Sequence, residues 1–576
     1  MDQQSSFSRD LRVDIAVNQV GFVPSIPKKC VVPVQEETEF RVISLGSGDT
    51  VYKADLQISN GDFGRYGVGD FSAVGLPGKY YVKAGSSRSY PFRVGHDVYD
   101  HALQMIVGYF SLQRCGPSTT GYLAPCHMDD GVRLDNGKHQ DVTGGWHDAS
   151  DLRKWVGATI YGMIGLTRLY EVLNPAWDQG QVMDELRWGN RYFLSMQEPE
   201  GYVMSHVGGD VLKHSDSNRW TDNVIGEEGG SAVTISPAPG GTPADITIIG
   251  AKDDRVIQTN PLDRFGQYNF VIVEAAMARL TRQKDVEYSK ECLTAASSCF
   301  DWCIRSGSDD NTGHLGVAME AAIELYRTTG SDKYKEFAID YARRLADLQV
   351  EKAIDPDIPI RGFYLTSAKN SEPYRNISRG CWHVIALCDL IEVFPEHTDL
   401  PKWREAVTLY ACDYLQTMSQ RSNFGIVPYG FYSADDPGGS RQIGKQWYRY
   451  FMRPEGWWVG VNANLASAGV GLVKAAKNLQ DFRLLETAQR QLDWILGVNP
   501  FNSSTVEGIG HNHPRQFINS SEFKPATPRL PGAVMNGIGG TADDQPDLYD
   551  GSYHTAEYWT PMVGYTMWLM AELSNY

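Results

Sequence analysis

Long hydrophobic runs are absent from this sequence, which limits where the chain can reside. No stretch approaches the roughly 18 consecutive apolar residues that a membrane-spanning helix requires, so we expect no transmembrane segment. Residues 1–10 are polar and lack the apolar core of a signal peptide. Two alternatives stay open: a cytoplasmic protein, or a protein whose leader has been removed and replaced by a start methionine.

Positive charge is in short supply as well. Lysine and arginine number 53 against 70 aspartates and glutamates, which gives a formal net charge of −17 at pH 7. Nucleic acids and anionic membranes attract proteins through a positive field, so we expect neither of them as the main partner. A neutral or cationic partner is compatible with this balance.

Cysteine is too sparse and too scattered for a disulfide scaffold. Nine cysteines are spread over 576 residues, and no C-x-x-C pair occurs. The lack of such a pair argues against a structural zinc site. Cys292, Cys299 and Cys303 recur at helical spacing and are interpreted as small core residues.

What the chain does contain is enough apolar material for a large core. Apolar residues make up 42% and charged residues 21%, and the length predicts roughly two to four domains. Aromatic residues reach 11%, with 14 tryptophans and 30 tyrosines. Flat aromatic rings stack on sugar faces but also fill protein cores, so composition alone does not choose between these uses.

The first part of the chain has the pattern of β-structure. Short alternating apolar runs separated by turn residues occupy the segment before residue 97, for example at 41–44, 50–53 and 79–82. Pro77-Gly78 imposes a turn between two of these runs. Several strands within about ninety residues predict a β-sandwich, which we assign to residues 11–97.

After residue 97 the periodicity becomes helical. About twelve segments, including 149–171 and 554–574, carry apolar residues at three- and four-residue spacing, and most are joined in pairs by short loops. Six antiparallel helix pairs can close into an (α/α)6 barrel, which we predict for residues 98–576. An open helical solenoid is the alternative, but no fixed repeat period supports it. The long loops that would gather at one end and line a groove are 114–148, 198–262, 421–459 and 497–553.

One segment combines two glycines with two closely spaced aspartates: Asp141-Val142-Thr143-Gly144-Gly145-Trp146-His147-Asp148-Ala149-Ser150-Asp151. The glycines allow a tight turn, and Asp148 and Asp151 stand three residues apart at a helix entrance, where both can face one side. A helix cap would explain one of them and leave the other unexplained. Two carboxylates in a groove suit the activation of water, because one holds the water and the other takes its proton.

This segment resembles the signature of glycoside hydrolase family 9, Asp-x-x-Gly-Gly-Trp-x-Asp-Ala-Gly-Asp. The chain matches every fixed position except the last glycine, which is Ser150 here. Further similarities lie at 126–130, 462–464, 496–500 and 507–510. Residues 18–22, Asn-Gln-Val-Gly-Phe, are similar to the immunoglobulin-like module that precedes the barrel in one branch of the family. The resemblance covers most of the chain and implies an immunoglobulin-like β-sandwich followed by an all-α (α/α)6 barrel.

The resemblance implies an inverting enzyme that acts on β-linked glucans and requires no cofactor. Carried over by position, Asp151 is the general base that activates water, and Asp148 helps to hold that water. A carboxylic acid across the groove, roughly 6.5–9.5 Å from the base, must protonate the leaving oxygen. This acid needs a raised pKa to keep its proton near neutrality.

The proton donor is where this chain departs from the family. The family uses a glutamate just before or at the start of the last helix, and an ungapped alignment places Tyr553 or His554 at that position. Glu557 lies about one helical turn further on and is our candidate for the acid, with an ordinary helix glutamate as the alternative interpretation. Asp547 and Asp550 are the runners-up, and a water-relayed acid is a further option.

A second departure concerns the residues that grip the sugar. Many family members carry Pro-His-His-Arg, whereas this chain has His511-Asn512-His513-Pro514-Arg515. His513 and Arg515 could hydrogen-bond sugar hydroxyls, and Arg515 could bind the carboxylate of a charged sugar. The cluster is equally compatible with a rigid loop.

The remaining substrate-binding candidates are aromatic residues and histidines in or beside the long loops: Trp146, Trp457, Trp559, Tyr553, His554, His127 and His206. Tryptophan can stack on a sugar, and core packing is the competing explanation for each. Residues 205–210, which end at Asp210, are rich in oxygen ligands. A structural calcium ion is therefore an option there, although no EF-hand pattern is present and the metal stays unknown.

The sequence therefore predicts a glycosidase that cleaves β-linked polysaccharide or oligosaccharide, with endo-β-1,4-glucanase activity as the default. An exo-acting relative specific for an amino or acidic sugar and a non-catalytic carbohydrate-binding relative are the alternatives, and the retained aspartate pair argues against the second. Such a function favours a secreted or periplasmic protein whose leader has been removed. The linker at 95–100 is too short for free motion, so we expect the first domain to buttress the barrel.

Overall fold

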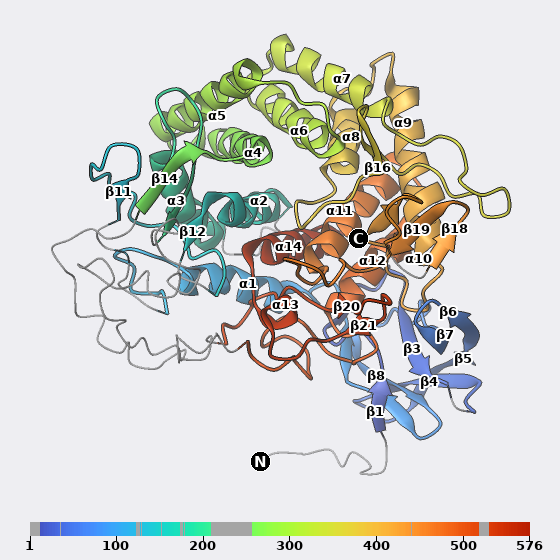
Figure 1. Ribbon diagram of the computed structural model, residues 1–576. Coiled ribbons are helices and arrows are strands. Elements are labelled where there is room, and N and C mark those ends of the chain that lie inside the picture. Colours follow the sequence, from blue (N-terminus) through green and yellow to red (C-terminus); the bar gives the residue numbers. More distant parts are fainter. Residues whose placement is uncertain are drawn as a thin grey trace.

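The computed structural model describes residues 12–34, 36–122, 127, 130–150, 153–172, 177, 179–208, 256–438, 441–517 and 529–576. These residues form a β-domain followed by a larger helical domain (Figure 1). Among the predicted site residues, Asp151 and Asp210 lie outside the described ranges.

The N-terminal domain consists of two sheets that pack on one core. Among the described residues, a seven-stranded sheet contains β1 (Arg12–Ile15), β2 (Gly21–Phe22), β4 (Glu39–Ser44), β5 (Thr50–Asp55), β8 (Gly78–Ala84), β9 (Ser87–Ser89) and β10 (Phe92–Val94). A three-stranded sheet has the order β3 (Lys29–Pro33), β7 (Gly64–Asp70), β6 (Gln57–Gly61). In β8 the alternate residues Tyr80, Val82 and Ala84 are buried, as expected for a strand with one face on a core. The predicted immunoglobulin-like β-sandwich is confirmed.

Six helices of the described chain form a closed inner ring in the helical domain. In ring order they are α2 (Val156–Val172), α4 (Arg264–Thr281), α6 (Thr312–Thr329), α8 (Trp382–Val393), α11 (Asn462–Leu479) and α14 (Thr560–Leu573), and α14 packs back on α2. These helices are buried on nearly all sides, and in α6 every residue from Leu315 to Leu325 is buried. A helix that is covered on all sides buries its polar side chains as well, such as Glu320 and Glu324 of α6.

A second layer of helices covers this ring (Figure 1). Its members are α1 (Asp100–Leu112), α3 (Gln179–Ser195), α5 (Val286–Ser306), α7 (Asp332–Ala346), α9 (Leu400–Thr408) with its continuations η2 (Leu409–Gln416) and α10 (Thr417–Ser419), and α12 (Arg483–Ile495). Tyr334, Ala338, Tyr341 and Leu345 of α7 are buried at three- and four-residue spacing, the pattern of a helix with one face on a core. The two layers make the predicted (α/α)6 barrel.

Two helix boundaries differ from the periodicity. The helix expected from residue 149 begins at Val156, because Lys154 and Trp155 form strand β12 and pair with β13 (Met204–Gly208). The helix expected over 554–574 is split into α13 (Tyr553–Ala556) and α14, because Glu557 and Trp559 adopt extended backbone conformations. Pro561 then occupies the first turn of α14, a position at which proline needs no N–H partner.

Short sheets lie in the connections that lead into the inner helices. Among the described residues, one sheet has the order β11 (Val132–Arg133), β14 (Val256–Pro261), β13, β12, and another has the order β17 (Gly430–Tyr432), β19 (Gln446–Arg449), β18 (Arg441–Ile443). Two hairpins pair β15 (Leu365–Ser367) with β16 (Asn370–Pro373) and β20 (Gly539–Gly540) with β21 (Pro546–Asp547). Except for the β15–β16 hairpin, which lies between α7 and α8, and β12, which takes the place of the start of a predicted helix, these strands fall within the long loops that the sequence identified.

The two domains share a packed interface. The tip of the β6–β7 hairpin reaches the helical domain, where the ring of Phe63 lies 4.8 Å from that of Tyr450 and 5.8 Å from that of Phe451. The carboxylate of Asp62 accepts hydrogen bonds from the hydroxyls of Tyr448 at 2.8 Å and Tyr450 at 2.9 Å. These contacts agree with the short linker and with a buttressing role for the first domain.

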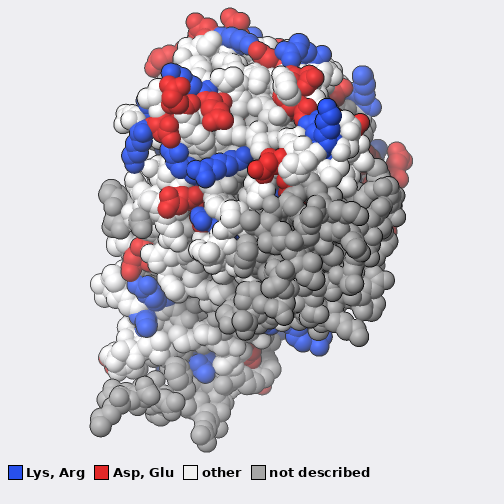
Figure 2. Space-filling view, turned by 90° about the vertical axis from the view of Figure 1, so that its left-hand side faces the viewer, with Lys and Arg blue, Asp and Glu red and all other residues white. Residues whose placement is uncertain are grey.

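The exterior carries charges of both signs. On the face shown in Figure 2, lysines and arginines lie among aspartates and glutamates. No helix within the described ranges is long and apolar enough to cross a membrane.

Candidate active site

A cleft of about 760 Å³ opens at the N-terminal ends of the inner helices. Its lining includes one or more residues at each of these ends: Ala158 in α2, Asp263 before α4, Asn311 before α6, Arg379 before α8, Val459 before α11 and Trp559 before α14. The predicted carboxylates Asp148 and Glu557 line the same cleft. Because backbone N–H groups at a helix N-terminus carry partial positive charge, this end of the barrel favours anionic groups.

The glycine pair of the signature makes the turn that the sequence predicts. Gly144 and Gly145 have φ values of +101° and +74°, in the region that favours glycine. A Cβ atom on Gly145 would lie 2.8 Å from the ring of Tyr192. The buried ammonium group of Lys154 donates to the carbonyls of Val142 at 2.8 Å and Gly144 at 3.2 Å. Steric fit and these hydrogen bonds fix the path of the chain into Asp148.

Asp148 is held against the last inner helix. Its side chain is 4% exposed, and the indole N–H of Trp559 donates to its Oδ2 at 3.2 Å. The backbone N–H of Thr560 donates to the carbonyl of Asp148 at 3.0 Å. The first residues of α14 and the signature therefore build one side of the cleft together, although they lie at opposite ends of the helical domain in sequence.

Glu557 lies beside the signature in extended backbone at the end of α13, not within a helix. The hydroxyl of Ser150 donates to its Oε1, and its own carbonyl accepts from the backbone N–H of Asn536 at 2.7 Å. Burial raises the pKa of Tyr109, and the negative charges of Asp148 and Glu557 raise it further, so both carboxylates lie near that phenol. Ser150 and Glu557, both departures from the family pattern, are thus in direct contact.

Three of the predicted aromatic candidates line the cleft: Trp457, Trp559 and Tyr553. The rings of Trp457 and Trp559 lie 5.9 Å apart and nearly perpendicular, at 80°. Trp457 is 57% exposed, although large apolar side chains are usually buried in this protein. An exposed indole in the lining of the cleft suits stacking on a sugar ring.

Three other candidates pack among protein groups and are not among the residues that line the cleft. Trp146 is 1% exposed, and its N–H donates to Glu185 at 3.3 Å. The ring of His206 stacks on that of Trp155 at 3.9 Å. The ring of His554 stacks on those of Trp458 and Tyr553, each at 3.8 Å. A role of these residues in sugar binding stays a prediction. In the structure they pack behind the walls of the cleft.

His513 and Arg515 also lie outside the cleft lining. Nδ1 of His513 is 3.0 Å from the carbonyl oxygen of Ser504. Arg515 is 78% exposed and pairs with Asp550, one of the runner-up acids. Their predicted contact with sugar therefore has no support from the cleft geometry and stays a prediction.

Several cleft residues belong to no motif and were not anticipated from the sequence: Arg153, Tyr161, Asp263, Asn311, His314, Asn376 and Arg379. Asp263 and Asn311 are the N-caps of α4 and α6, where their side chains accept from the backbone N–H groups of Gly266 and His314. Arg379 pairs with Asp263 at 2.6 Å. The sequence signal that could have identified Asp263 and Asn311 is a helix N-cap residue, because the start of every inner helix faces the cleft.

A metal could be held by Cys115, His127 and His147, whose ligand atoms lie within 4.8 Å of one another. All three residues are buried. One thiolate and two imidazoles suit zinc, for which tetrahedral nitrogen and sulfur ligands are typical. The prediction against a structural zinc site rested on the missing C-x-x-C pair, whereas the fold gathers these possible donors from separate segments. His147 directly precedes Asp148, so an ion here would brace the signature.

Family models match both parts of the chain. One described as glycosyl hydrolase family 9 matches residues 99–566, and one described as cellulase N-terminal ig-like domain matches residues 12–89. The β-sandwich, the barrel and the cleft define the architecture of a glycoside hydrolase. The chain belongs to glycosyl hydrolase family 9.

Curated relatives are distant from this chain. Endoglucanase D of Acetivibrio thermocellus is 26% identical over 380 residues, which cover 60% of this chain and 55% of that protein. A cellodextrinase of Butyrivibrio fibrisolvens is 25% identical over 374 residues, which cover 58% of this chain and 62% of that protein. The chain thus aligns with little more than half the length of these relatives.

A solved structure shows the same fold. A metagenome-derived glycoside hydrolase family 9 endoglucanase superposes with a TM-score of 0.69 over 98% of this chain and 99% of that chain. The two sequences are 20% identical.

Proposed function

We propose that this protein hydrolyses β-1,4-linked glucan chains, or oligosaccharides derived from them, with inversion at the anomeric carbon. Family membership supports this proposal, as do the names of the relatives, endoglucanase and cellodextrinase. The observation that carries it is that Asp148 and Glu557 line one cleft next to the exposed ring of Trp457.

The proposed chemistry is a single displacement by water. Asp148 holds the water, and Asp151 takes one of its protons as the oxygen attacks the anomeric carbon. The bond to the leaving sugar breaks at the same time, and Glu557 gives its proton to the leaving oxygen. The hydrogen bonds from Trp559 to Asp148 and from Ser150 to Glu557 would hold both carboxyl groups in place during this step.

Glu557 is preferred over Tyr553 as the proton donor. Both side chains line the cleft, and one of the two ungapped alignments places Tyr553 at the position of the family glutamate. A carboxyl group is a much stronger acid than a phenol, so it transfers a proton to a departing alkoxide more readily near neutral pH. The hydrogen bond from Ser150 is a second reason, because it restrains the Glu557 carboxyl group.

Four further assignments belong to this proposal. We place the domain boundary between residues 97 and 98, and the site of action outside the cytoplasm, where polymeric glucans are met. Sugar binds at Trp457, Trp559 and Tyr553. Zinc bound by Cys115, His127 and His147 would be structural, since the chemistry described above requires no metal.

Product chromatography tests the proposal. The full chain is incubated with β-1,4-glucan, xyloglucan, chitosan oligosaccharides and acidic glycans, and NMR follows the anomer first released. Oligosaccharides of α-configuration from β-glucan are expected from the wild type, with loss of product in Asp151→Ala and Glu557→Gln. Tyr553→Phe is the matched control, because it keeps the ring that we assign to sugar binding and removes only the phenol hydroxyl that could replace Glu557 as the acid, so it should retain turnover.

Each other outcome points to one alternative. Monomer release from an amino or acidic glycan would replace the endo-β-1,4-glucanase assignment with an exo-acting one. Binding without product from any glycan would make the protein a non-catalytic carbohydrate-binding relative. Full activity in Glu557→Gln would remove Glu557 from the mechanism.

A further inference from the structure

Residues 376–379 line the cleft as a short loop that leads into α8. Ser378 in this loop is buried and has a φ value of +58°, in the left-handed region that residues other than glycine rarely adopt. Such a conformation costs free energy and persists only where the surrounding structure imposes it, which is common at functional sites.

Three inner helices hold the loop in place. Nδ2 of Asn464 in α11 donates to the carbonyl of Asn376 at 2.7 Å and to its Oδ1 at 2.9 Å. The hydroxyls of Tyr565 in α14 and Tyr161 in α2 donate to the carbonyl of Arg379 at 2.7 Å and 3.5 Å. The backbone that carries the Arg379 side chain is therefore fixed from several sides of the ring.

The loop presents two exposed side chains to the cleft, those of Ile377 and Arg379. Ile377 is 46% exposed and the Arg379 side chain is 45% exposed. Among the described residues, the Arg379 side chain makes one hydrogen bond, from Nη2 to Oδ2 of Asp263 at 2.6 Å. A guanidinium has five N–H donors, so four of them are available to a molecule in the cleft.

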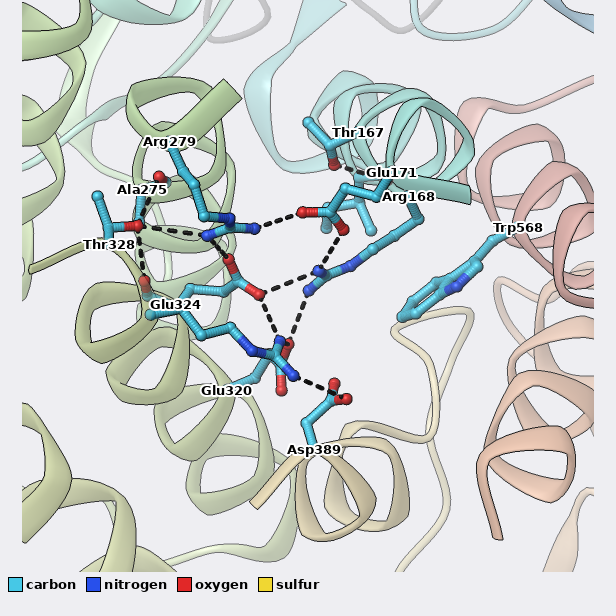
Figure 3. Close-up of polar contacts among 12 residues, drawn as sticks. Thr167, Arg168, Glu171, Ala275, Arg279, Glu320, Glu324, Thr328, Asp389 and Trp568 are labelled. Atoms are coloured by element: carbon cyan, nitrogen blue, oxygen red, sulfur yellow. Dashed lines mark hydrogen bonds and ion pairs between the residues drawn. The ribbon is translucent and has the colours of Figure 1, made fainter. Parts of the chain in front are cut away.

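A contribution to stability does not account for this arrangement. At the opposite end of the barrel, buried Arg168 of α2 donates to Glu320 at 2.7 Å and to Glu324 at 3.0 Å, both in α6 (Figure 3). Such buried pairs connect the inner helices. The pair of Arg379 and Asp263 is half exposed instead, and exposed ion pairs contribute little to stability. A strained loop that displays a largely unpaired guanidinium points to binding.

The Arg379–Asp263 pair stands apart from the proposed reacting groups. Asp263 directly precedes α4, whereas Glu557 precedes α14, and α2 lies between these two helices in the ring. Neighbouring packed helices lie about 8–10 Å apart, so in a regular ring of six the starts of α4 and α14 are separated by roughly 14–17 Å. This separation is longer than one sugar unit, so a sugar at Arg379 is not one of the two that the cleaved bond joins.

We propose that Arg379 is a specificity-determining residue that donates hydrogen bonds to the hydroxyls of a sugar unit beyond the two joined by the cleaved bond. Asp263 neutralises the guanidinium, so an uncharged glucan unit suits this subsite better than a sugar acid does. Ile377 offers an apolar surface to the C–H groups of the ring. The inference rests on the proposed hydrolysis, which supplies the position of the cleaved bond.

Chain length is the variable that tests this role. The full chain and Arg379→Ala are compared by kcat/KM on cello-oligosaccharides from cellobiose to cellohexaose. In the wild type, kcat/KM should rise at the length that reaches Arg379. Arg379→Ala should lose roughly tenfold or more at and above that length and keep its rates on shorter substrates, because hydrogen bonds from a charged group are lost. Arg379→Lys keeps the charge without the planar fork and should recover only part of the loss.

Arg361→Ala is the matched control, because Arg361 is equally exposed and pairs with Asp413 at 2.7 Å away from the residues that line the cleft. It should retain the wild-type dependence on length. An equal loss at every length in both Arg379 variants, as a general structural defect would cause, overturns the subsite even if the cleft is active. No loss at any length overturns it as well. A larger loss on an acidic oligosaccharide than on cellohexaose overturns the assignment to an uncharged sugar.

A binding measurement separates this inference from the proposed hydrolysis. Calorimetric titration of cellohexaose into Glu557→Gln, with and without Arg379→Ala, measures affinity in the absence of turnover. The second substitution should weaken binding by roughly tenfold, and equal affinity of the two chains overturns the subsite. If the wild type hydrolyses no glycan and Arg379→Ala still weakens its binding of cellohexaose, the subsite stands and the catalytic proposal alone is overturned.

Discussion

At the scale of single residues, the most informative contact joins two positions at which this chain differs from its family. Ser150 replaces the last glycine of the signature, and its hydroxyl donates to Glu557, which stands near but not at the family's acid position. The serine at position 150 thus provides a hydrogen-bond donor to Glu557. Within the proposed mechanism, we interpret the pair as a rearranged proton donor in which Ser150 positions the carboxyl group.

Restoring the family residue at position 150 should harm this enzyme. Ser150→Gly is expected to lower kcat by roughly two- to tenfold with little change in KM, because a hydrogen bond to the protonated, uncharged carboxyl group contributes about 0.5–1.5 kcal/mol. Steady-state kinetics on the best substrate from the product assay measures the effect. Ser150→Thr keeps the hydroxyl and should recover much of the rate. An unchanged kcat in Ser150→Gly would dismiss the positioning role.

At the scale of structural elements, the loop from Gly144 to Asp148 is shaped from several sides. Tyr192 of α3 leaves no room for a side chain on Gly145, and Lys154 binds two carbonyls of the loop. His147 brings it to Cys115 and His127. These contacts act on the backbone, so their loss should displace Asp148 without removing a reacting group.

The two glycines of the loop offer a matched pair of substitutions. Gly145→Ala should cost about 2–5 kcal/mol and abolish measurable turnover, because strain at positive φ adds to the clash with Tyr192. Gly144→Ala meets no atom within 4 Å and carries the strain alone, about 1–3 kcal/mol. Denaturant unfolding and activity of both variants measure the difference. Equal losses would show that packing against Tyr192 is unimportant.

The cluster of Cys115, His127 and His147 can be tested for a metal ion that stabilises the loop. Cys115→Ser should reduce the zinc content of the purified protein, lower its Tm and lower activity, because a structural metal contributes directly to folding. Elemental analysis and calorimetry before and after chelation provide the readout. Cys412→Ser, at a half-buried cysteine outside the cluster, is the control and should retain its zinc. A wild-type protein that carries no zinc would contradict the assignment.

The sequence predicted strands and helices correctly where only one face of the strand or helix is buried. The alternation in β8 and the three- and four-residue spacing in α7 match the exposed and buried faces found. The start of α2 and the break at Glu557–Trp559 were missed, because pairing of β12 with β13 and contact with the signature overrode local helical periodicity. Local pattern predicts elements well until a tertiary contact competes for the same backbone.

At the scale of the whole molecule, the inner helices all present their N-termini to the cleft and their C-termini to the opposite end of the barrel. One end of the barrel therefore favours anionic groups and the other favours cations. The β-domain closes the side of the barrel near α12, where Asn18 donates to the buried carboxylate of Asp493 at 2.9 Å. Interdomain contacts of this kind couple the stability of the two domains.

Asp493 should make that stability depend on pH. Burial raises its pKa from 3.8 to about 6, so the folded chain binds more protons than the unfolded chain between these values. The stability that this group contributes is complete below about pH 4 and is lost as the pH rises through about 6, a change of about 3 kcal/mol.

Urea unfolding across this pH range measures the slope for Asp493→Asn. The variant should show a flatter profile and higher stability than the wild type above about pH 6, with a residual slope from buried Asp544, whose pKa is likewise raised to about 6. Exposed Asp435→Asn is the control and should follow the wild type. A variant with the wild-type slope would exclude Asp493 as the source.

The sequence by itself determined the class of the fold, the order of the two domains and the signature with Asp148. These depend on periodicity and on glycine, tryptophan and aspartate at fixed spacing, and such information is local along the chain. The match to glycosyl hydrolase family 9 confirms that level of interpretation.

Only the tertiary structure decided which residues share a site. Ser150 hydrogen-bonds Glu557, and Cys115 lies beside two histidines. Charged residues of the inner helices come together at the end of the barrel opposite the cleft. All of these neighbours are far apart in sequence. Closure of the helical ring creates these neighbours, because its packing brings six helix starts together at one end and six helix ends at the other. No local pattern encodes that convergence, so no reading of neighbouring residues could have supplied it.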